Sequence, residues 1–221
     1  MQAMHRHGSP YISALSHDWL TPFYDTLIRW TMPEATFKAQ LVAEARIKRD
    51  ESILDLGCGT ATLTMLTKSI HPETTVIGVD GDSKILGIGT RKVRKARLNV
   101  AFAQAMSFEL PYANASFDRV LSSLMFHHLT RENKVRSLKE VYRVLRSGGE
   151  LHIADFGKPQ NLLMRIASYP WRLFDRSNNT ADHIKGLLAT LMRDSGFVEV
   201  HESARYMTLF GTLSLYAGRK T

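Results

Sequence analysis

A glycine-rich segment in the first third of the chain has the composition of a turn that brings backbone N–H groups to a ligand. Residues 52–63 read SILDLGCGTATL, so an apolar run that contains Asp55 leads into Gly57 and Gly59. A strand followed by such a turn and then by a helix presents N–H groups and a helix N-terminus to a phosphate or nucleotide. The segment therefore predicts a nucleotide-like cofactor.

The spacing of the glycines argues against a dinucleotide. The dinucleotide fingerprint has a third glycine three positions after the second, and Thr62 occupies that position here. Asp55 also places a carboxylate beside the turn, where it would repel a pyrophosphate and attract a cation. We therefore expect a cofactor that carries an amino group.

Four further acidic or basic residues lie at the ends of other apolar runs or just after them. Residues 76–80 read VIGVD, and an acid such as Asp80 at the tip of a second strand is well placed to accept both hydroxyls of a ribose. His127 and His128 follow a later run, and Asp155 ends another. Histidine and carboxylate side chains are common general bases, so these positions are candidates for proton transfer.

Residues 55–60, DLGCGT, resemble motif I of the class I S-adenosylmethionine-dependent methyltransferases. Further matches follow in the expected order at 76–80 (VIGVD), 110–112 (LPY), 116–121 (SFDRVL), 126–129 (FHHL) and 144–151 (VLRSGGEL). Together they look like the ubiquinone and menaquinone biosynthesis type, a subgroup that also acts on many other small molecules. The resemblance covers residues 47–156 well and the remainder loosely.

The resemblance implies an α/β fold, a Rossmann-like three-layer sandwich whose seven-stranded sheet is mostly parallel. Its strand order would be 3-2-1-4-5-7-6, with the seventh strand antiparallel. It also implies S-adenosyl-L-methionine as cofactor and S-adenosyl-L-homocysteine as product. The residues expected to bind the cofactor are Asp55, Gly57, Cys58, Gly59, Thr60, Asp80, Gly81, Met106, Ser107 and Ser123.

We have further expectations for two of these residues, Cys58 and Met106, and for the adjacent Ala61. Ala61 stands where motif I has its third glycine, which keeps the turn small but allows less backbone freedom. Met106 stands where many relatives have an acid that accepts from the adenine amino group, so we expect apolar packing and backbone groups of Met106 and Ser107 to hold adenine. Cys58 is the only cysteine, and we expect it to be a small buried packing residue.

Methyl transfer from a sulfonium is an in-line displacement in which the enzyme mainly aligns and desolvates the reactants. Alignment contributes about 7–11 kcal/mol, so a catalytic residue is optional. If the acceptor is a carbon acid, a phenol or an amine, a base is still useful, and His127, His128 and Asp155 are the candidates. A His-His pair here is also frequent in relatives with different substrates, so a structural role stays open.

The alternation of apolar runs with helical patterns predicts the elements that position these residues. Strands are expected over 52–56, 75–79, 100–103, 118–122 and 150–155. Helices are expected over 36–47, from near 60, from 83 with Asp82 as N-cap, and over 131–145, where Gly148 and Gly149 end the helix. Residues 198–200 and 207–217 read as the two strands of a hairpin.

A chain of 221 residues fits a single methyltransferase domain, 1–221, with two segments outside the common scaffold. Residues 1–33 would form an N-terminal cap, and residues 156–180 an insertion that covers the acceptor site. Side chains in these segments could line an apolar acceptor pocket or merely cover the sheet edge. The candidate substrate-binding residues are Tyr11, His17, Trp19, Tyr24 and Trp171.

The net charge of +8 is unevenly distributed. Six of the basic residues fall within 84–97, namely Lys84, Arg91, Lys92, Arg94, Lys95 and Arg97. A solvated helix face, a nucleic acid and an anionic lipid surface each fit this run, but aromatic residues are not interleaved, which disfavours single-stranded nucleic acid. The second segment mixes apolar and arginine residues, which fits weak membrane-surface association or a lid over a hydrophobic substrate.

Cysteine usage and hydropathy limit the remaining classes. One cysteine excludes an internal disulfide, and the sequence has no Cys/His cluster with zinc spacing, so we expect a metal-free protein of a reducing compartment. The N-terminal residues have no apolar signal region and no window is long enough to span a membrane, which predicts a cytoplasmic protein. The sequence leaves the oligomeric state open between monomer and homodimer.

The favoured function is methyl transfer from S-adenosylmethionine to a small, aromatic or lipophilic acceptor. An RNA methyltransferase would fit the positive charge, but residues 122–125 read SSLM where amine-methylating nucleic-acid enzymes usually show Asn/Asp-Pro-Pro-aromatic. A non-catalytic S-adenosylmethionine-binding protein is the other alternative, because motif I and Asp80 argue only for binding.

Overall fold

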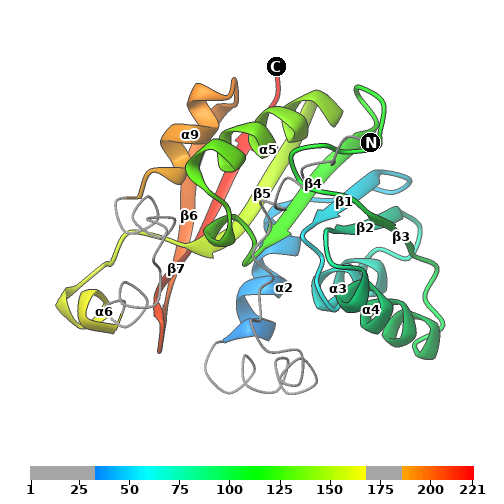
Figure 1. Cartoon of the computed structure of the whole chain (residues 1–221), viewed down its shortest axis with the longest axis horizontal. Coiled ribbons are helices and arrows are strands. Elements are labelled where there is room, and N and C mark those ends of the chain that lie inside the picture. The colour runs from blue at the N-terminus through cyan, green and yellow to red at the C-terminus, as the bar shows by residue number, and fades with distance from the viewer. Residues whose placement is uncertain (1–32, 168–185) are drawn as a thin grey trace, which may run out of the picture.

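The computed structural model describes residues 33–167 and 186–221, which form a seven-stranded sheet with helices on both faces (Figure 1). The strands are β1 (Ser52–Leu56), β2 (Thr75–Asp80), β3 (Ala101–Gln104), β4 (Phe117–Ser123), β5 (Leu145–Phe156), β6 (Val198–Thr208) and β7 (Gly211–Arg219). The helices are α2 (Glu34–Glu44), α3 (Thr62–Ile70), α4 (Ser83–Lys95), α5 (Arg131–Val144), α6 (Leu162–Ala167) and α9 (Leu188–Asp194). A short 3₁₀ helix, η2, spans Phe126–His128.

The strand order is β3-β2-β1-β4-β5-β7-β6, as the family resemblance implies. Strands β1 to β5 pair in parallel, and β7 is antiparallel to both β5 and β6. Parallel neighbours need crossover connections, which the helices between the early strands provide. The carboxyl ends of β1, β2, β4 and β5 therefore meet at one edge of the sheet, which we call the carboxyl edge.

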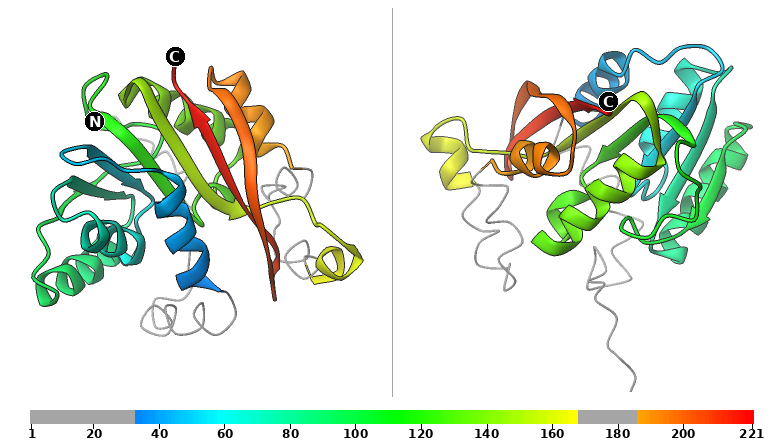
Figure 2. Two further views of the ribbon diagram at one scale, coloured as in Figure 1. Left: turned by 180° about the vertical axis from the view of Figure 1, so that it is seen from behind. Right: turned by 90° about the horizontal axis from the view of Figure 1, so that it is seen from above.

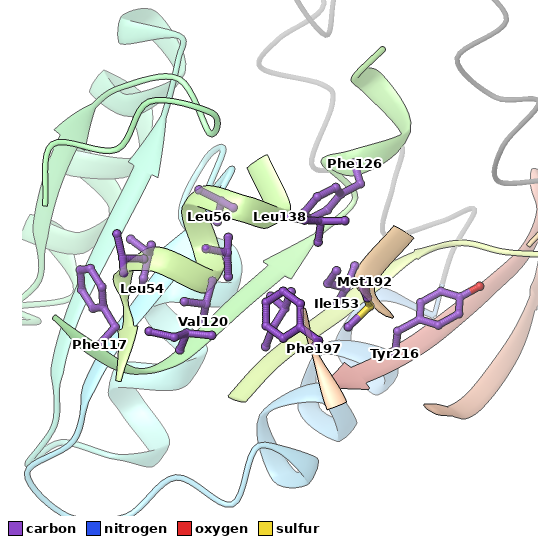
Figure 3. Packing of buried hydrophobic residues seen from close by; sticks show 14 of the residues in the cluster. Leu54, Leu56, Phe117, Val120, Phe126, Leu138, Ile153, Met192, Phe197 and Tyr216 are labelled. Carbon is purple, nitrogen blue, oxygen red and sulfur yellow. The ribbon is translucent and has the colours of Figure 1, made fainter. Parts of the chain in front are cut away.

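Apolar side chains alternate between the two faces of the sheet and build one core on each. On one face, Phe37 and Leu41 of α2 and Leu63 of α3 pack with Ile53 and other strand residues. On the other face, side chains of α5 and α9 pack on the sheet (Figure 3); they include Leu138 and Met192, with Leu54, Val120 and Ile153 beneath them. The helices thus form two outer layers around the sheet, which confirms the predicted three-layer sandwich (Figure 2).

Two boundaries near the glycine-rich turn and the N-terminal helix differ from the sequence prediction. Helix α3 begins at Thr62 instead of near residue 60, because Ala61 has φ 66° and lies in the left-handed region. Helix α2 spans Glu34–Glu44, so it begins and ends earlier than the predicted 36–47. The N-cap prediction for α4 is confirmed, since the Asp82 carboxylate accepts from the backbone N–H groups of Lys84 and Ile85.

The prediction that Gly148 and Gly149 form a turn before the fifth strand is wrong. Strand β5 begins at Leu145, directly after α5, and contains both glycines. Gly148 donates its N–H to the Lys220 carbonyl, and Lys220 donates its N–H to the Gly149 carbonyl. These bonds to the C-terminal segment keep both glycines within the strand, at an irregularity in the β4–β5 pairing between Leu145 and Glu150, where Gly148 has a φ of 76°.

The predicted hairpin is confirmed as β6 and β7. Strand β6 extends to Thr208, beyond the predicted 198–200, and β7 spans Gly211–Arg219 instead of the predicted 207–217. Of the two segments predicted to lie outside the scaffold, residues 156–167 are described in part as α6, and residues 1–32 and 168–185 lie outside the described residues. Within the described part of the chain, every helix is too short or too polar to cross a bilayer.

Candidate active site

The glycine-rich turn is attached by hydrogen bonds to the end of the neighbouring strand. The backbone N–H groups of Gly57 and Cys58 both donate to the carbonyl of Val79, at 2.8 and 3.0 Å. The N–H of Gly59 donates to Asp80 Oδ2 at 2.9 Å. The turn and the acid at the tip of β2 therefore form one unit at the carboxyl edge.

The two glycines of the turn are needed for different reasons. Both have positive φ, 71° at Gly57 and 54° at Gly59, a region that side chains disfavour. A Cβ on Gly57 would lie 2.3 Å from Met125 Cγ, whereas a Cβ on Gly59 would meet nothing within 4 Å. Gly57 is thus required by packing, and Gly59 borders open space that a ligand can enter.

Asp55 is a buried carboxylate that is only half satisfied. Its side chain is 1% exposed, and Thr64 Oγ1 donates to Oδ2 at 2.5 Å. Oδ1 is buried and has no hydrogen-bond partner among the described residues. Burial is the main reason that the pKa of Asp55 rises to about 6. A buried acceptor of this kind suits a cationic donor, so Asp55 fits an amino group of a bound ligand.

Asp80 ends β2 and is the residue that the sequence analysis expects to bind a ribose. Its Oδ1 accepts from the N–H of Asp82 at 3.0 Å, in addition to the bond from Gly59, and burial raises its pKa. Carboxylate oxygens accept more than one hydrogen bond, so the ribose hydroxyls can add to these contacts. Gly81 follows directly, and its carbonyl accepts from Gln104 Nε2 at 3.2 Å.

The loop after β3 adjoins this acid. Ala105 donates its N–H to the Asp80 carbonyl at 3.1 Å, and the half-buried Met106 and Ser107 come next. Ser107 Oγ forms a 2.7 Å hydrogen bond with Ser137 Oγ of α5. Because the hydroxyl is engaged there, the adenine contact expected of Ser107 would be made by its backbone, and that contact stays a prediction.

The remaining predicted cofactor residues lie around the same turn. Cys58 is buried, and burial beside Asp55 raises the pKa of its thiol well above the ordinary value, so the thiol is neutral and unreactive. Thr60 Oγ1 accepts from Lys92 Nζ at 3.3 Å, which connects α4 to the turn. Ser123 ends β4, and its buried Oγ has no hydrogen-bond partner in the described part of the chain.

His127 and Asp155 form a pair beside the turn. His127 Nδ1 lies 2.8 Å from Asp155 Oδ1, and the His127 N–H donates to Asp155 Oδ2 at 3.3 Å. The Phe156 N–H also donates to Oδ1 at 2.7 Å, and the Phe156 ring meets the His127 ring edge to face. Asp155 is completely buried and His127 is 15% exposed at its side chain, so the carboxylate fixes the orientation of the imidazole.

This arrangement separates the three candidate bases. The buried Asp155 holds His127, which suits a positioning role instead of the direct proton transfer considered from the sequence. His128 is exposed, and its ring lies against the His127 ring with centroids 3.9 Å apart and an angle of 41° between the planes. His127 is therefore the best-held base of the three.

Met125 joins the two halves of the site, and sequence reasoning missed it. Its side chain covers Gly57, and η2 with His127 begins at the next residue. Thr64 was missed as well, although a hydroxyl on the first turn of a helix after motif I is a detectable signal. For Met125 the sequence contains no comparable signal, since its contact depends on the pairing of β1 with β4.

The five candidate substrate residues, Tyr11, His17, Trp19, Tyr24 and Trp171, lie outside the described residues. Residues 33–167 and 186–221 contain no group of three His, Cys, Asp or Glu side chains that could hold a metal ion.

Comparison with known proteins shows the class of protein. A family model described as methyltransferase domain matches residues 53–149. The ubiquinone/menaquinone biosynthesis C-methyltransferase UbiE of Escherichia coli O1:K1 is 30% identical over 196 residues, which cover 79% of this chain and 76% of that one. The chain therefore belongs to the class I S-adenosylmethionine-dependent methyltransferases. Within that class it resembles the ubiquinone and menaquinone biosynthesis enzymes.

The chain is also similar to a second methyltransferase relative and to two solved structures. The demethylmenaquinone methyltransferase of Lactobacillus johnsonii is 31% identical over 133 residues, 59% of this chain and 54% of that protein, so the chain matches about half of that relative's length. YcgJ from Bacillus subtilis has a TM-score of 0.67 at 16% identity and covers 83% and 97% of the two chains. Phosphoethanolamine N-methyltransferase 2 of Haemonchus contortus, solved with S-adenosylhomocysteine, has a TM-score of 0.66 at 15% identity. The match covers 84% of this chain and 52% of that one. The structural likenesses show the same fold.

Alanine at the two glycines of the turn should separate ligand binding from packing. For Gly59→Ala we expect the dissociation constant for S-adenosylmethionine to rise at least about tenfold, with a loss of about 1–2 kcal/mol in the free energy of unfolding from the positive φ. Gly57→Ala should lose about 2–5 kcal/mol, because overpacking against Met125 adds to the same strain. Calorimetric titration and urea unfolding measure both quantities. Unchanged cofactor affinity in Gly59→Ala would show that the open space is not the cofactor site.

Cofactor affinity should depend on pH through Asp55. Without ligand its pKa is about 6, so it is largely protonated below pH 6. A cationic amino group favours the carboxylate and lowers that pKa, so binding releases the proton. The dissociation constant should therefore rise as pH falls below 6, by up to about tenfold per pH unit.

Calorimetry between pH 5 and 7, in buffers of different ionisation enthalpy, counts the released protons. Asp55→Asn should bind more weakly at pH 7 and lose most of the pH dependence. If the variant keeps the full pH dependence, another group such as Asp80 causes it, because burial raises that pKa too.

Proposed function

We propose that this methyltransferase transfers the methyl group to a small lipophilic aromatic acceptor of the quinol type, with a ring carbon as the methylated atom. The observation that carries the proposal is the His127–Asp155 pair at the same edge of the sheet as the glycine-rich turn. The names of the relatives, a C-methyltransferase of ubiquinone and menaquinone biosynthesis and a demethylmenaquinone methyltransferase, support this class of acceptor. A cytoplasmic location stays a prediction.

Residues at the carboxyl edge, around the glycine-rich turn, would hold the cofactor in three places. Asp55 would accept from its amino group, Asp80 would accept from the ribose hydroxyls, and the loop at Met106 would pack on adenine. Bound there, S-adenosylmethionine supplies an electrophilic methyl group with a leaving group already activated by positive charge. The open space beside Gly59 and the orphaned Oδ1 of Asp55 both fit this ligand.

His127 would act on the acceptor. Methylation of a phenolic ring at carbon is easier when the hydroxyl has lost its proton, because the oxygen then donates electron density to the ring. An imidazole is a suitable base for that proton near neutral pH. Asp155 would keep the ring in one orientation and stabilise the positive charge that the imidazole gains on accepting the proton.

A methyl-transfer screen tests the proposed acceptor. S-adenosylmethionine with a labelled methyl group is supplied with a demethylated quinol, simple phenols, amines or RNA. We expect label in the quinol, bonded to ring carbon. Label in RNA alone would identify a nucleic-acid enzyme, and tight cofactor binding without transfer to any acceptor would identify a non-catalytic binding protein.

Substitution of the two histidines tests the base. His127→Ala should lower kcat by about 100-fold or more, the lower range for a general base, and change the dissociation constant of the cofactor by less than about threefold. His128→Ala is the matched control, because it removes the neighbouring, exposed imidazole of the same short helix, and its kcat should stay within about threefold of the parent.

Asp155→Asn should fall between the two histidine variants in kcat, since the ring keeps a polar neighbour of the same size but loses the negative charge. Rapid-quench and steady-state measurements on all three variants give kcat, KM and cofactor affinity separately. Full turnover in both histidine variants would remove the base from the mechanism and leave positioning alone.

A further inference from the structure

Apolar side chains are exposed at one place far more than elsewhere on the described surface. Six large apolar side chains are exposed within residues 33–167 and 186–221, and five of them lie on α6 or at the β6–β7 turn. These five are Leu162, Leu163, Ile166, Met207 and Leu209, with exposed fractions of 57% to 71%. We call them the apolar patch. Isolated exposed apolar residues are ordinary, but a cluster indicates an interaction surface.

The patch is held together by the fold. The Gln160 N–H donates to Thr212 Oγ1 at 3.2 Å, and Asn161 Nδ2 contacts Met207 Sδ at 3.7 Å, which ties α6 to the β6–β7 hairpin. Asn161 Oδ1 also accepts from the N–H of Met164, whose buried side chain anchors the helix. Helix α6 is therefore fixed with Leu162, Leu163 and Ile166 turned outward.

The charged residues near the patch in sequence are basic, which favours an anionic partner. Residues 156–167 contain Lys158 and Arg165 and no acid, and residues 206–213 contain no charged residue. Apolar side chains flanked by cations suit the boundary between acyl chains and anionic headgroups. A second copy of the patch would bring like charges together, which disfavours self-association.

The position of the patch connects it to the active site. Asp155 is the penultimate residue of β5, and α6 begins six residues after the strand ends. In Figure 1 the chain leaves the lower end of β5 and reaches α6 on that side, beside the lower end of the β6–β7 hairpin. The patch therefore lies on the side of the molecule where β5 ends, one residue after Asp155.

We propose that the apolar patch docks on an anionic lipid surface, with Leu162, Leu163, Ile166 and Leu209 inserted between headgroups. Lys158 and Arg165 face the headgroup charges. The benefit of docking, access to an acceptor dissolved in the bilayer, rests on the proposed function. The docking itself does not, and it is measured without any acceptor.

Vesicle sedimentation tests the docking. The full chain is mixed with phosphatidylcholine vesicles that contain about a quarter phosphatidylglycerol, an anionic composition that attracts basic residues. We expect binding that weakens with salt and is at least about tenfold weaker on pure phosphatidylcholine. The triple variant Leu162→Ser, Leu163→Ser and Ile166→Ser should weaken binding at least about tenfold, because three inserting side chains are lost.

Ile70→Ser is the matched control for the loss of an exposed apolar side chain. Ile70 is 49% exposed and ends α3, at the edge of the sheet opposite the carboxyl edge, so vesicle binding should not change. Leu209→Ser tests the second element of the patch, and Lys158→Glu with Arg165→Glu should abolish the preference for anionic vesicles. All substituted side chains are exposed, and thermal unfolding checks that each variant is folded.

The outcomes separate this proposal from the proposed function. Absence of vesicle binding by the parent chain, or equal binding by the triple variant, overturns the docking even if quinol methylation is found. Sedimentation-velocity dimers that the triple variant abolishes, without vesicle binding, would show that the patch is a protein interface and also overturn it. Vesicle binding with the expected dependence on the patch supports docking even if the quinol is not methylated.

Discussion

The hydrogen bonds from the glycine-rich turn to the end of β2 are the interaction on which the candidate site depends. Gly57 and Cys58 share the carbonyl of Val79, and Gly59 donates to Asp80. These bonds exist only when β1 and β2 pair in parallel with Leu56 beside Val79. A shift of one residue in that register would turn Asp80 to the opposite face of the sheet. The glycine-rich turn therefore keeps these hydrogen bonds only in this register of β1 and β2.

Two buried carboxylates at this edge differ in the hydrogen bonds that they receive, and this difference fits the roles proposed for them. Asp155 is bonded to the His127 ring and to two backbone N–H groups, so its charge is compensated within the protein. Asp55 receives one bond from Thr64 and keeps a buried oxygen without a partner among the described residues. Uncompensated buried charge is costly. The first carboxylate accordingly fixes a side chain, and the second is suited to a ligand that brings positive charge.

The carboxyl edge also organises what lies around the chemistry. Met125 packs on Gly57 and leads into η2, so the cofactor turn and His127 share one support. The continuation of β5 leads to α6 and to the apolar patch on the same side. The basic residues of α4 are mostly exposed, and Lys92 contacts Thr60 at the turn.

The sequence by itself determined the features that depend on neighbouring residues. The apolar runs, the glycine-rich turn after β1 and the Asp82 N-cap are local patterns, and the family resemblance supplied the order of the strands. Tertiary structure decided the contacts between distant segments: Asp155 with His127, Met125 over Gly57, and the extension of β5 through its bonds to Lys220. Such contacts depend on which strands become neighbours, and side chains separated by tens of residues carry no local signal of their partners. For that reason the sequence could nominate candidate residues individually, whereas their proposed division into base, positioning group and ligand acceptor required the fold.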